Sequence, residues 1–320
     1  MESYYFWGQD KFKQLSTSLS HTQIDPFGND ASAVNNADNI DHMDVAPIAI
    51  QNGFTSLSGE GVWQNIPQSL FPNEDVIVRT FVRPDPQRSY AIVSLVKIDS
   101  KKISIGTEAG LRYPANLHKI AGPGKVPASI QQSNMLIAAF NGGFQEKDGE
   151  YGMIVGDKTY VPLKLGIPAV YLFEDGSLQF VDYMGQLIPP GVAAIRQNGP
   201  YLVHNGLLSA YEERDRDTWG RTLTNSLYTW RSGLGVAKDG SIIFAAGESL
   251  IPTTLAKALL AAGAVDAIQL DINPPWVRFF FYTPLGNGQY SSRILMKNMS
   301  NAGQTYLTGY EKDFFYLYKK

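Results

Sequence analysis

The amino-acid sequence predicts an α+β protein: a large curved, mixed but mostly antiparallel sheet with few helices and one parallel strand–helix–strand unit. Short apolar or alternating segments recur along the chain and are separated by Asn-Gly, Asp-Gly and Gly-Asp turn signals. The 30 glycines and 18 prolines indicate many such turns. One segment, residues 233–277, has the pattern of strand, helix and strand. Many strands with few helices are typical of α+β domains.

The composition limits the classes of function. The 320 residues suffice for a sizeable buried core, and 44% hydrophobic with 18% charged residues is ordinary for a globular protein. The net charge of −3 offers no basic surface for nucleic acid. The absence of cysteine excludes disulfides, thiolate nucleophiles and cysteine-based zinc sites.

The first 50 residues differ in character from the rest of the chain. Residues 1–50 are rich in Asn and Asp and show no periodicity, so we expect an irregular N-terminal extension without a core of its own, followed by one domain over 51–320. No apolar run is long enough to span a bilayer. The first ten residues, MESYYFWGQD, lack the basic start and apolar core of a signal peptide.

Strand patterns follow in order along the domain. VIVRTFVRPDP and SYAIVSLVKIDSKKISIGTEAG predict a hairpin or meander, and residues 129–132 suggest a short helix before the buried strand MLIAAF. YGMIVGDKTYVP, PAVYLFEDGSLQFVD and GVAAIRQNGPYLVHNG read as strands joined by tight turns. DFFYLYKK predicts a final strand at the C-terminus.

The segment 233–277 is the most informative. GLGVAKDGSIIFAAGE has two apolar runs around a Lys-Asp-Gly turn signal and predicts a hairpin. Thr253 or Thr254 could cap a helix over LAKALLAA, which Gly263 would close. The apolar run AIQLDI then stops at Asp271.

Polar side chains stand where these strands end. A strand–helix–strand crossover makes its two strands parallel, so their carboxyl ends share one edge of the sheet. That edge would bring Glu248 and Asp271 together, and Asn141 ends another strand. A single carboxylate after a strand commonly lies in a solvated loop, but the combination at one edge favours a ligand site.

Four sequence blocks carry a resemblance to a known family. They are AAFNGGF at 138–144, RQNGPYLVHNG at 196–206, Trp230-Arg231, and GLGVAKDGSIIFAAG followed by TLAKALLAAGAVDAIQLD. In this order and spacing they resemble the phosphodiester glycosidase domain, the catalytic domain of the lysosomal uncovering enzyme, which also occurs in many secreted bacterial proteins. The chain looks like a divergent, bacterial-type member, with the resemblance covering roughly residues 90–310.

The resemblance implies a hydrolase that cleaves a sugar phosphodiester, or a related glycan of the cell envelope. Such a reaction passes through an oxocarbenium-like transition state, which a carboxylate stabilises, and it needs cationic donors for the phosphate. Asp271 and Glu248 are the candidate catalytic carboxylates. Arg231, and more weakly Arg221, are the candidate phosphate ligands, because guanidinium matches phosphate in a bidentate manner. A surface salt bridge is the competing interpretation of Arg231.

The other candidate substrate-binding residues follow strands. Gly142 and Gly143 could present backbone N–H groups to an anion, and Asn141 could bind a sugar hydroxyl; a plain tight turn is the alternative. Asn198 allows the same two interpretations. His204 follows a strand within a matching block and reads as a structural histidine.

One departure from the family pattern affects the expected activity. The family has glycines and a serine after its aspartate, whereas here Asp271 precedes Ile272-Asn273-Pro274-Pro275-Trp276. Two prolines remove two backbone donors and prevent a close backbone approach to a ligand. Asn273 and Trp276 become candidate substrate contacts, Trp276 by stacking on a sugar face or alternatively as part of the core.

Three functions therefore compete. The first is an extracellular or cell-envelope phosphodiester glycosidase, from which a signal or anchor has been trimmed. The second is a catalytically inactive carbohydrate-binding or cell-envelope module on the same fold. The third is a glycosidase acting on neutral glycans. The expected partner is a carbohydrate or sugar phosphate; no cofactor is expected, and the sequence leaves a divalent metal open.

Overall fold

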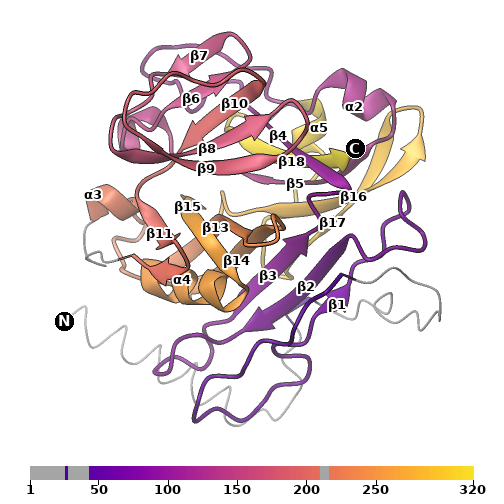
Figure 1. Ribbon diagram of the computed structural model, residues 1–320, viewed down its shortest axis with the longest axis vertical. Coiled ribbons are helices and arrows are strands. Elements are labelled where there is room, and N and C mark those ends of the chain that lie inside the picture. The colour runs from indigo at the N-terminus through magenta and orange to yellow at the C-terminus, as the bar shows by residue number, and fades with distance from the viewer. Residues whose placement is uncertain (1–25, 28–42, 210–215) are drawn as a thin grey trace.

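The computed structural model of the protein describes residues 26–27, 43–209 and 216–320. Its regular structure is dominated by antiparallel strands, which confirms the α+β class, but the strands are divided among three sheets rather than one (Figure 1). The described helices are few and short: α2 (Ala128–Gln132), η1 (Glu146–Asp148, a 3-10 helix), α3 (Arg216–Trp219), α4 (Pro252–Ala261) and α5 (Thr305–Thr308).

The largest sheet has eight strands in the order β1-β2-β3-β14-β13-β15-β11-β12. Their bounds are β1 Gln64–Asn65, β2 Ile77–Val82, β3 Val93–Ile98, β14 Ile242–Leu250, β13 Thr229–Ala237, β15 Ala264–Ile272, β11 Tyr201–His204 and β12 Leu207–Leu208.

Two five-stranded sheets complete the fold. One has the order β17-β16-β5-β18-β4, with bounds β17 Gln289–Ile294, β16 Phe279–Gly286, β5 Leu136–Asn141, β18 Phe314–Lys319 and β4 Ile103–Glu108. The other has the order β7-β6-β10-β8-β9, with bounds β7 Lys158–Val161, β6 Met153–Val155, β10 Val192–Gln197, β8 Ile167–Phe173 and β9 Leu178–Tyr183.

Both faces of the central eight-stranded sheet are buried. Along β14, Ile242 and Phe244 belong to the main core shared with the two smaller sheets, whereas Ile243 and Ala245 belong to the core beneath α4. Burial on both faces explains why this strand reads as a continuous apolar run rather than as an alternating one. Figure 1 shows α4 beside β14 and β11, and the β6–β10 sheet above them.

Phe140 joins the central sheet to the β4–β5–β16–β17–β18 sheet. Its ring centre lies 5.0 Å from that of Phe244, 5.5 Å from that of Phe279 and 5.4 Å from that of Phe315. Aromatic clusters of this kind bury a large apolar area, so they fix the end of β5 relative to β13 and β15.

The predicted hairpin over residues 233–248 is confirmed, since β13 and β14 pair antiparallel around the turn at Gly240. The predicted cap of the following helix is wrong. The helix starts at Pro252, and the preceding residue is Ile251, whose side chain has no oxygen that could act as a cap. Proline at the first helical position removes one of the N–H groups that have no partner within the helix. Gly263 follows the helix with a positive φ of 90°, as predicted for its C-terminal end.

The predicted crossover needs a correction. β14 and β15 each pair antiparallel with β13, which lies between them, so they run in the same direction without being paired to each other. Their carboxyl ends do lie at one edge: Leu250 pairs with Thr229 and Ile272 pairs with Arg231.

Two predicted local connections also differ. β2 and β3 form a hairpin, but β4 belongs to a different sheet from β3, and β11 to a different sheet from β10. A tight-turn signal between two strands does not determine whether the second pairs with the first or with a distant strand. The strands predicted on either side of the Gly-Asp and Asp-Gly turns are confirmed, and they pair with each other as β6–β7 and β8–β9.

The predicted N-terminal extension lies mostly outside the described residues, so the division at residue 50 stays a prediction; residues 43–50 contain no helix or strand.

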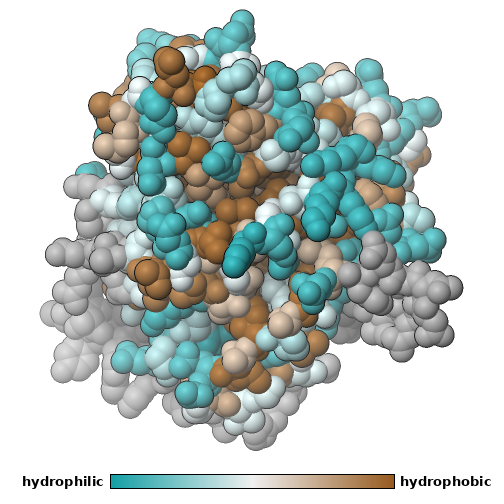
Figure 2. Space-filling view, viewed as in Figure 1, coloured by the Kyte–Doolittle hydropathy of each residue, from teal (hydrophilic) through white to brown (hydrophobic). Residues whose placement is uncertain are grey.

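Figure 2 shows hydrophobic residues gathered across the middle of one face, between the β8–β9 layer and the β13–β15 layer. Within the described part of the chain, no helix has the length and hydropathy required to cross a membrane.

Candidate functional site

The end of β5 and the start of β18 lie side by side. Asn141, the last residue of β5, is the Cα partner of Phe314, the first residue of β18. Lys312 and Asp313, which precede β18, therefore come next to the loop that leaves β5. In an antiparallel pair the start of one strand faces the end of its neighbour, so polar residues from both segments can meet there.

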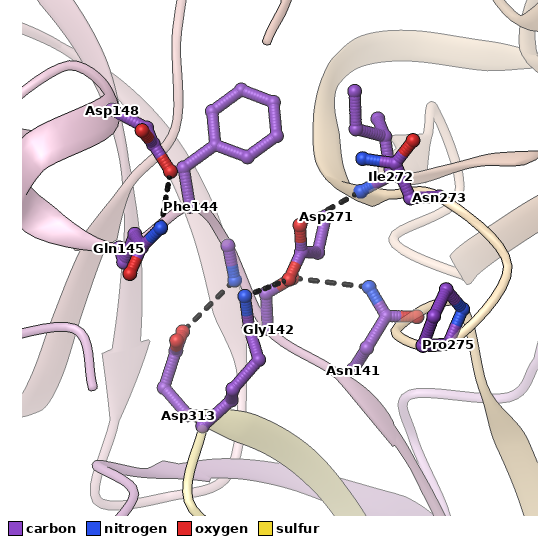
Figure 3. Close-up of polar contacts among 12 residues, drawn as sticks. Asn141, Gly142, Phe144, Gln145, Asp148, Asp271, Ile272, Asn273, Pro275 and Asp313 are labelled. Carbon is purple, nitrogen blue, oxygen red and sulfur yellow. Dashed lines mark hydrogen bonds and ion pairs between the residues drawn. The ribbon is translucent and has the colours of Figure 1, made fainter. Parts of the chain in front are cut away.

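Asp271 near the end of β15 is joined to this point by backbone hydrogen bonds. Its N–H donates to the carbonyl of Gly142 at 2.9 Å, and the Gly142 N–H donates to the carbonyl of Asp313 at 3.0 Å. Figure 3 shows the Asp271 carboxyl group between Asn141 on one side and Asp313 on the other. Segments from residues 141–143, 271–273 and 312–313 thus form the candidate site.

The carboxyl group of Asp271 is buried and paired with Lys312. The residue is only 3% exposed; its Oδ1 accepts the Ile272 N–H at 2.9 Å, and its Oδ2 lies 2.5 Å from Lys312 Nζ. Burial raises the pKa of Asp271, and the neighbouring Lys312 opposes that rise. Removing one partner of such a pair strands a charge away from water, so the pair constrains both residues.

Aromatic rings cover the Lys312 ammonium. Its Nζ lies 4.6 Å from the ring centre of Trp276 and 5.6 Å from that of Tyr113, and both rings are partly exposed. Contacts of this kind are attractive because the face of an aromatic ring is electronegative. The predicted candidate Trp276 therefore lies at the site, where it contacts Lys312 while part of the side chain reaches the surface.

A second ion pair lies next to the first. The Arg196 Nε donates to Asp313 Oδ2 at 2.9 Å, and both side chains are fully buried. The Arg196 Nη2 donates to the carbonyl of Phe144 at 2.7 Å, and Asp313 Oδ2 also accepts the Gly143 N–H at 2.9 Å. Because Arg196 is on β10 and Asp313 precedes β18, this pair joins the two smaller sheets.

The predicted glycines serve this packing. A Cβ on Gly142 would collide with the side chain of Asp313, and a Cβ on Gly143 would come 2.6 Å from Asn198 Oδ1 and 2.7 Å from Arg196 Nη2. Their Cα atoms are therefore surrounded by protein side chains, and the Gly143 N–H is already bonded to Asp313. The described contacts explain both glycines without a ligand.

The side chains of the three predicted asparagines connect segments that are distant in the sequence. Asn141 donates from Nδ2 to Ser232 Oγ at 2.9 Å and accepts the Arg278 N–H at 3.0 Å. Asn198 accepts the Phe144 N–H at 2.7 Å and donates to the carbonyl of Gln269 at 2.8 Å.

Asn273 adopts a left-handed conformation, with φ of 78°, which asparagine tolerates better than most residues. Its Oδ1 accepts Thr229 Oγ1–H at 3.0 Å, and its Nδ2 donates to the carbonyl of Arg221 at 3.2 Å. The amide of each predicted asparagine is thus bonded within the protein, and all three residues are buried.

The predicted phosphate ligand Arg231 is buried and bonded internally. Its Nε donates to the carbonyl of Leu250 at 3.0 Å, and its Nη1 donates to Gln269 Oε1 at 2.7 Å and to the carbonyl of Trp219 at 2.9 Å. This geometry gives the guanidinium a structural task at the edge of the central sheet. Arg221 is exposed.

The two predicted carboxylates occupy different environments. Glu248 is exposed, whereas Asp271 is buried, and none of the hydrogen bonds or ion pairs of Asp271 involves Glu248. The pairing of β14 and β15 with β13 places both residues towards one edge, as predicted. The structure brings Asn141 to Asp271 but gives Asp271 a lysine, not a second glutamate, as its partner.

Lys312, Asp313 and Arg278 were missed by sequence reasoning. A usable signal was present: the pair Lys312-Asp313 stands where the predicted last strand, DFFYLYKK, begins. The search for polar residues considered only the positions where predicted strands end. In an antiparallel pair the start of one strand lies beside the end of its neighbour, so polar residues at strand starts should have been considered as well.

Other polar groupings lie elsewhere. A surface hollow of about 440 Å³ is lined by Asp44, Asp75, Asp99 and Asp239, at the edge of the central sheet where β14 begins. His204 bonds Asp266 on β15 at 2.9 Å. Across the described ranges, no three His, Cys, Asp or Glu side chains come together in a way that could hold a metal ion.

Comparison with known families identifies part of the chain. Residues 134–271 match the family model described as phosphodiester glycosidase, which confirms the predicted resemblance over a narrower range than 90–310. The matched segment ends at Asp271, directly before the sequence that departs from the family pattern. The match supports a phosphodiester glycosidase kind of function. None of the curated proteins matches the chain.

Two solved structures resemble the fold distantly. A hypothetical protein from Synechocystis has 13% identity and a TM-score of 0.46; the likeness covers 77% of this chain and 63% of that one. The auto-inhibited catalytic domain of zebrafish N-acetylglucosamine-1-phosphodiester alpha-N-acetylglucosaminidase has 12% identity and a TM-score of 0.43, covering 80% of this chain and 87% of that one. Both TM-scores lie below 0.5, so neither likeness bears on the site.

Proposed function

We propose that this protein is a hydrolase that cleaves the bond between the anomeric carbon of a sugar and a phosphate oxygen in a phosphodiester, with Asp271 as the carboxylate at the reacting centre. The observation that carries the proposal is the position of Asp271. It is the last residue of the matched segment, and it lies at a sheet edge in a buried pair with Lys312.

The chemistry suits a single well-placed carboxylate. A phosphate is a good leaving group, so protonation of the leaving oxygen matters less than in an ordinary glycoside. The oxocarbenium-like transition state carries positive charge at the anomeric carbon, and an ionised carboxylate beside it lowers the barrier. Partial exclusion of water strengthens that interaction, because charges attract more strongly where the effective dielectric constant is low.

Lys312 favours the ionised form of Asp271 that this role requires. Burial on its own favours the neutral carboxylic acid, and the ammonium 2.5 Å away favours the carboxylate. A substrate that carries an anionic phosphate offers Lys312 a second partner. The ammonium could then be shared between the substrate and Asp271, which would leave a carboxylate oxygen available to the sugar.

A second function is favoured by one observation. Asp271 is nearly inaccessible in the free protein, and the exposed Pro274 and Pro275 lie beside the partly exposed Trp276. An aromatic ring at the surface next to rigid proline backbone suits sugar binding without catalysis. This is the carbohydrate-binding or cell-envelope module, for which Asp271 and Lys312 would be structural.

The test is turnover by the unmutated protein on a panel of glycosyl and aryl phosphodiesters, with neutral aryl glycosides beside them. We expect sugar release from phosphodiesters and a loss on the order of a hundredfold or more in Asp271→Asn. Because Asp271→Asn leaves Lys312 buried without its counter-charge, the double variant Asp271→Asn/Lys312→Met serves as the folding control. Folding is checked by circular dichroism.

Three results would contradict the proposal. Full activity in Asp271→Asn would remove the carboxylate from the mechanism. Turnover of neutral glycosides alone would assign the chain to ordinary glycoside hydrolysis. Binding of sugars without turnover of any compound would establish the binding module instead.

A further inference from the structure

Among the residues that the structure describes, one cation near Asp271 has no carboxylate partner. Asp271 is paired with Lys312, and Asp313 is paired with Arg196. Arg278 is a third cation beside them. Its Nε donates to the carbonyl of Pro275 at 2.9 Å, whereas its Nη1 is buried and has no hydrogen-bond partner among residues 26–27, 43–209 and 216–320.

Arg278 is held at the site from two sides. Its backbone N–H donates to Asn141 Oδ1 at 3.0 Å, and its guanidinium lies 4.8 Å from the ring centre of Tyr310. Burial raises the pKa of Tyr310; the charge of Arg278 lowers it and the charge of Asp271 raises it further. Asn141 places Arg278 next to Asp271, because its Oδ1 accepts the Arg278 N–H and its Nδ2 donates to the carbonyl of Gly142, which also accepts the Asp271 N–H.

A second buried donor belongs to Tyr306, whose ring centre lies 5.1 Å from that of Tyr310, the ring that Arg278 also contacts. The hydroxyl of Tyr306 has no hydrogen-bond partner within the described ranges, although its side chain is fully buried. Burial raises the pKa of Tyr306, and the charge of Arg278 opposes that rise. An unbonded buried donor is costly, so unpartnered donors near an uncompensated cation point to a missing acceptor.

A third unpartnered atom is an acceptor. Asp313 Oδ1 makes no hydrogen bond to the described residues, although its Oδ2 is bonded twice. Two donors with one acceptor suit a ligand that carries both anionic oxygens and hydroxyl groups. A phosphate ester of a sugar has this combination, whereas a simple halide has no hydroxyl to donate.

We propose that Arg278 and Lys312 form an anion subsite for the phosphate group of the substrate, next to Trp276. Trp276 is two residues from Arg278 in the sequence, and its ring centre lies 4.6 Å from Lys312 Nζ. The assignment rests on the proposed function for the identity of the ligand. The sequence predicted Arg231 as the phosphate ligand, but its guanidinium is bonded to internal acceptors. The subsite assigns this role to two other cations, Arg278 and Lys312, which lie beyond the matched segment.

The subsite also explains how a buried carboxylate becomes available. In the free protein Lys312 lies on Asp271 and beneath the rings of Trp276 and Tyr113. A phosphate held by Arg278 competes for the same ammonium. Binding of the anion therefore lets Lys312 be shared between the phosphate and Asp271, which leaves a carboxylate oxygen available to the sugar while its counter-charge stays nearby.

The test is titration of the protein with inorganic phosphate and glucose 1-phosphate by calorimetry, with glucose as the neutral comparison. We expect both phosphates to bind and Arg278→Gln to weaken them roughly tenfold or more, as charge-assisted hydrogen bonds require. Lys238→Gln is the control, since it removes the same charge from the exposed hairpin turn at the opposite end of β13. Arg278→Lys should restore part of the affinity.

Arg278→Gln is the informative variant because its backbone bond to Asn141 is retained, whereas Lys312→Gln strands Asp271. Unchanged phosphate affinity in Arg278→Gln, an equal loss in Lys238→Gln, or no phosphate binding by the unmutated protein would overturn the subsite. If phosphate binding depends on Arg278 but no phosphodiester is hydrolysed, the subsite stands and the hydrolase proposal fails. If phosphodiesters are hydrolysed with the same KM in Arg278→Gln, the subsite fails and the hydrolase proposal stands.

Discussion

Lys312 and Asp313 are neighbours in the sequence and belong to two ion pairs with different surroundings. Asp313 pairs with Arg196 where both side chains are fully buried, and that guanidinium also donates to three backbone carbonyls. Lys312 pairs with Asp271 under partly exposed aromatic rings, and the ammonium makes no other hydrogen bond or ion pair in the described part of the chain.

The difference separates a structural pair from a candidate site. In the Arg196 pair the guanidinium is held by the pair and by three carbonyls, so no substrate could compete for it. In the Lys312 pair one ammonium holds one carboxylate, and a stronger or additional anion could redistribute it. The number of bonds that a charged group makes within the protein is therefore a better guide to function here than burial, which both pairs share.

The largest effect on stability is expected from Arg196→Met. The substitution leaves Asp313 buried without a cation and removes the ion pair that connects β10 to the start of β18, so the free energy of unfolding should fall by about 3–5 kcal/mol. Urea denaturation measures the change. Lys97→Met is the control, because its partner Asp239 is half exposed and the loss should stay within about 1 kcal/mol. Equal losses in the two variants would contradict the structural assignment of the Arg196 pair.

Glu108 tests what a partly buried carboxyl does without any cation. Its carboxyl group has no hydrogen bond or ion pair to the described residues, and desolvation raises its pKa from 4.5 to about 7. The folded state therefore binds more protons than the unfolded state between pH 4.5 and 7, so this group lowers stability as pH rises through that window. Above the window the loss reaches at most about 3 kcal/mol.

Glu108→Gln should remove this pH dependence. We expect the variant and the unmutated protein to have similar unfolding free energies near pH 4, and the variant to be more stable at pH 8. Glu311→Gln, at an exposed position, should leave the profile unchanged. A variant that is less stable than the unmutated protein at pH 8 would show that Glu108 has a stabilising partner.

The smallest expected effect is the coupling between Asp271 and Lys312. In a cycle of Asp271→Asn, Lys312→Met and the double variant, we expect a coupling of about 2 kcal/mol, with the double variant more stable than the sum of the single changes predicts. The value should be smaller than the loss in Arg196→Met, because the Lys312 side chain is 11% exposed and rests on aromatic rings. Strict additivity would mean that the pair does not form in solution.

Sequence reasoning located one member of the site and several of its supports. Asp271 and Asn141 were predicted from their places after apolar strands, and both lie at the junction of β5, β15 and β18. Local sequence patterns do not show whether the hydrogen-bonding groups of a side chain are already bonded within the protein. A sequence cannot tell that the Asn198 amide and the Arg231 guanidinium are bonded to carbonyls from distant segments. The catalytic role assigned to Glu248 and the substrate contact assigned to Trp276 stay predictions.

What the sequence by itself determined is local. Alternation, turn signals and the helical spacing of residues 252–261 determine which segments become strands or helix, because these depend on side chains a few positions apart. Only the tertiary structure decided which strands pair. β5 and β18 are separated by more than half of the chain, and their pairing brings Lys312 to Asp271. That choice depends on the burial of apolar faces across three sheets, including the Phe140 cluster, and no local pattern encodes it.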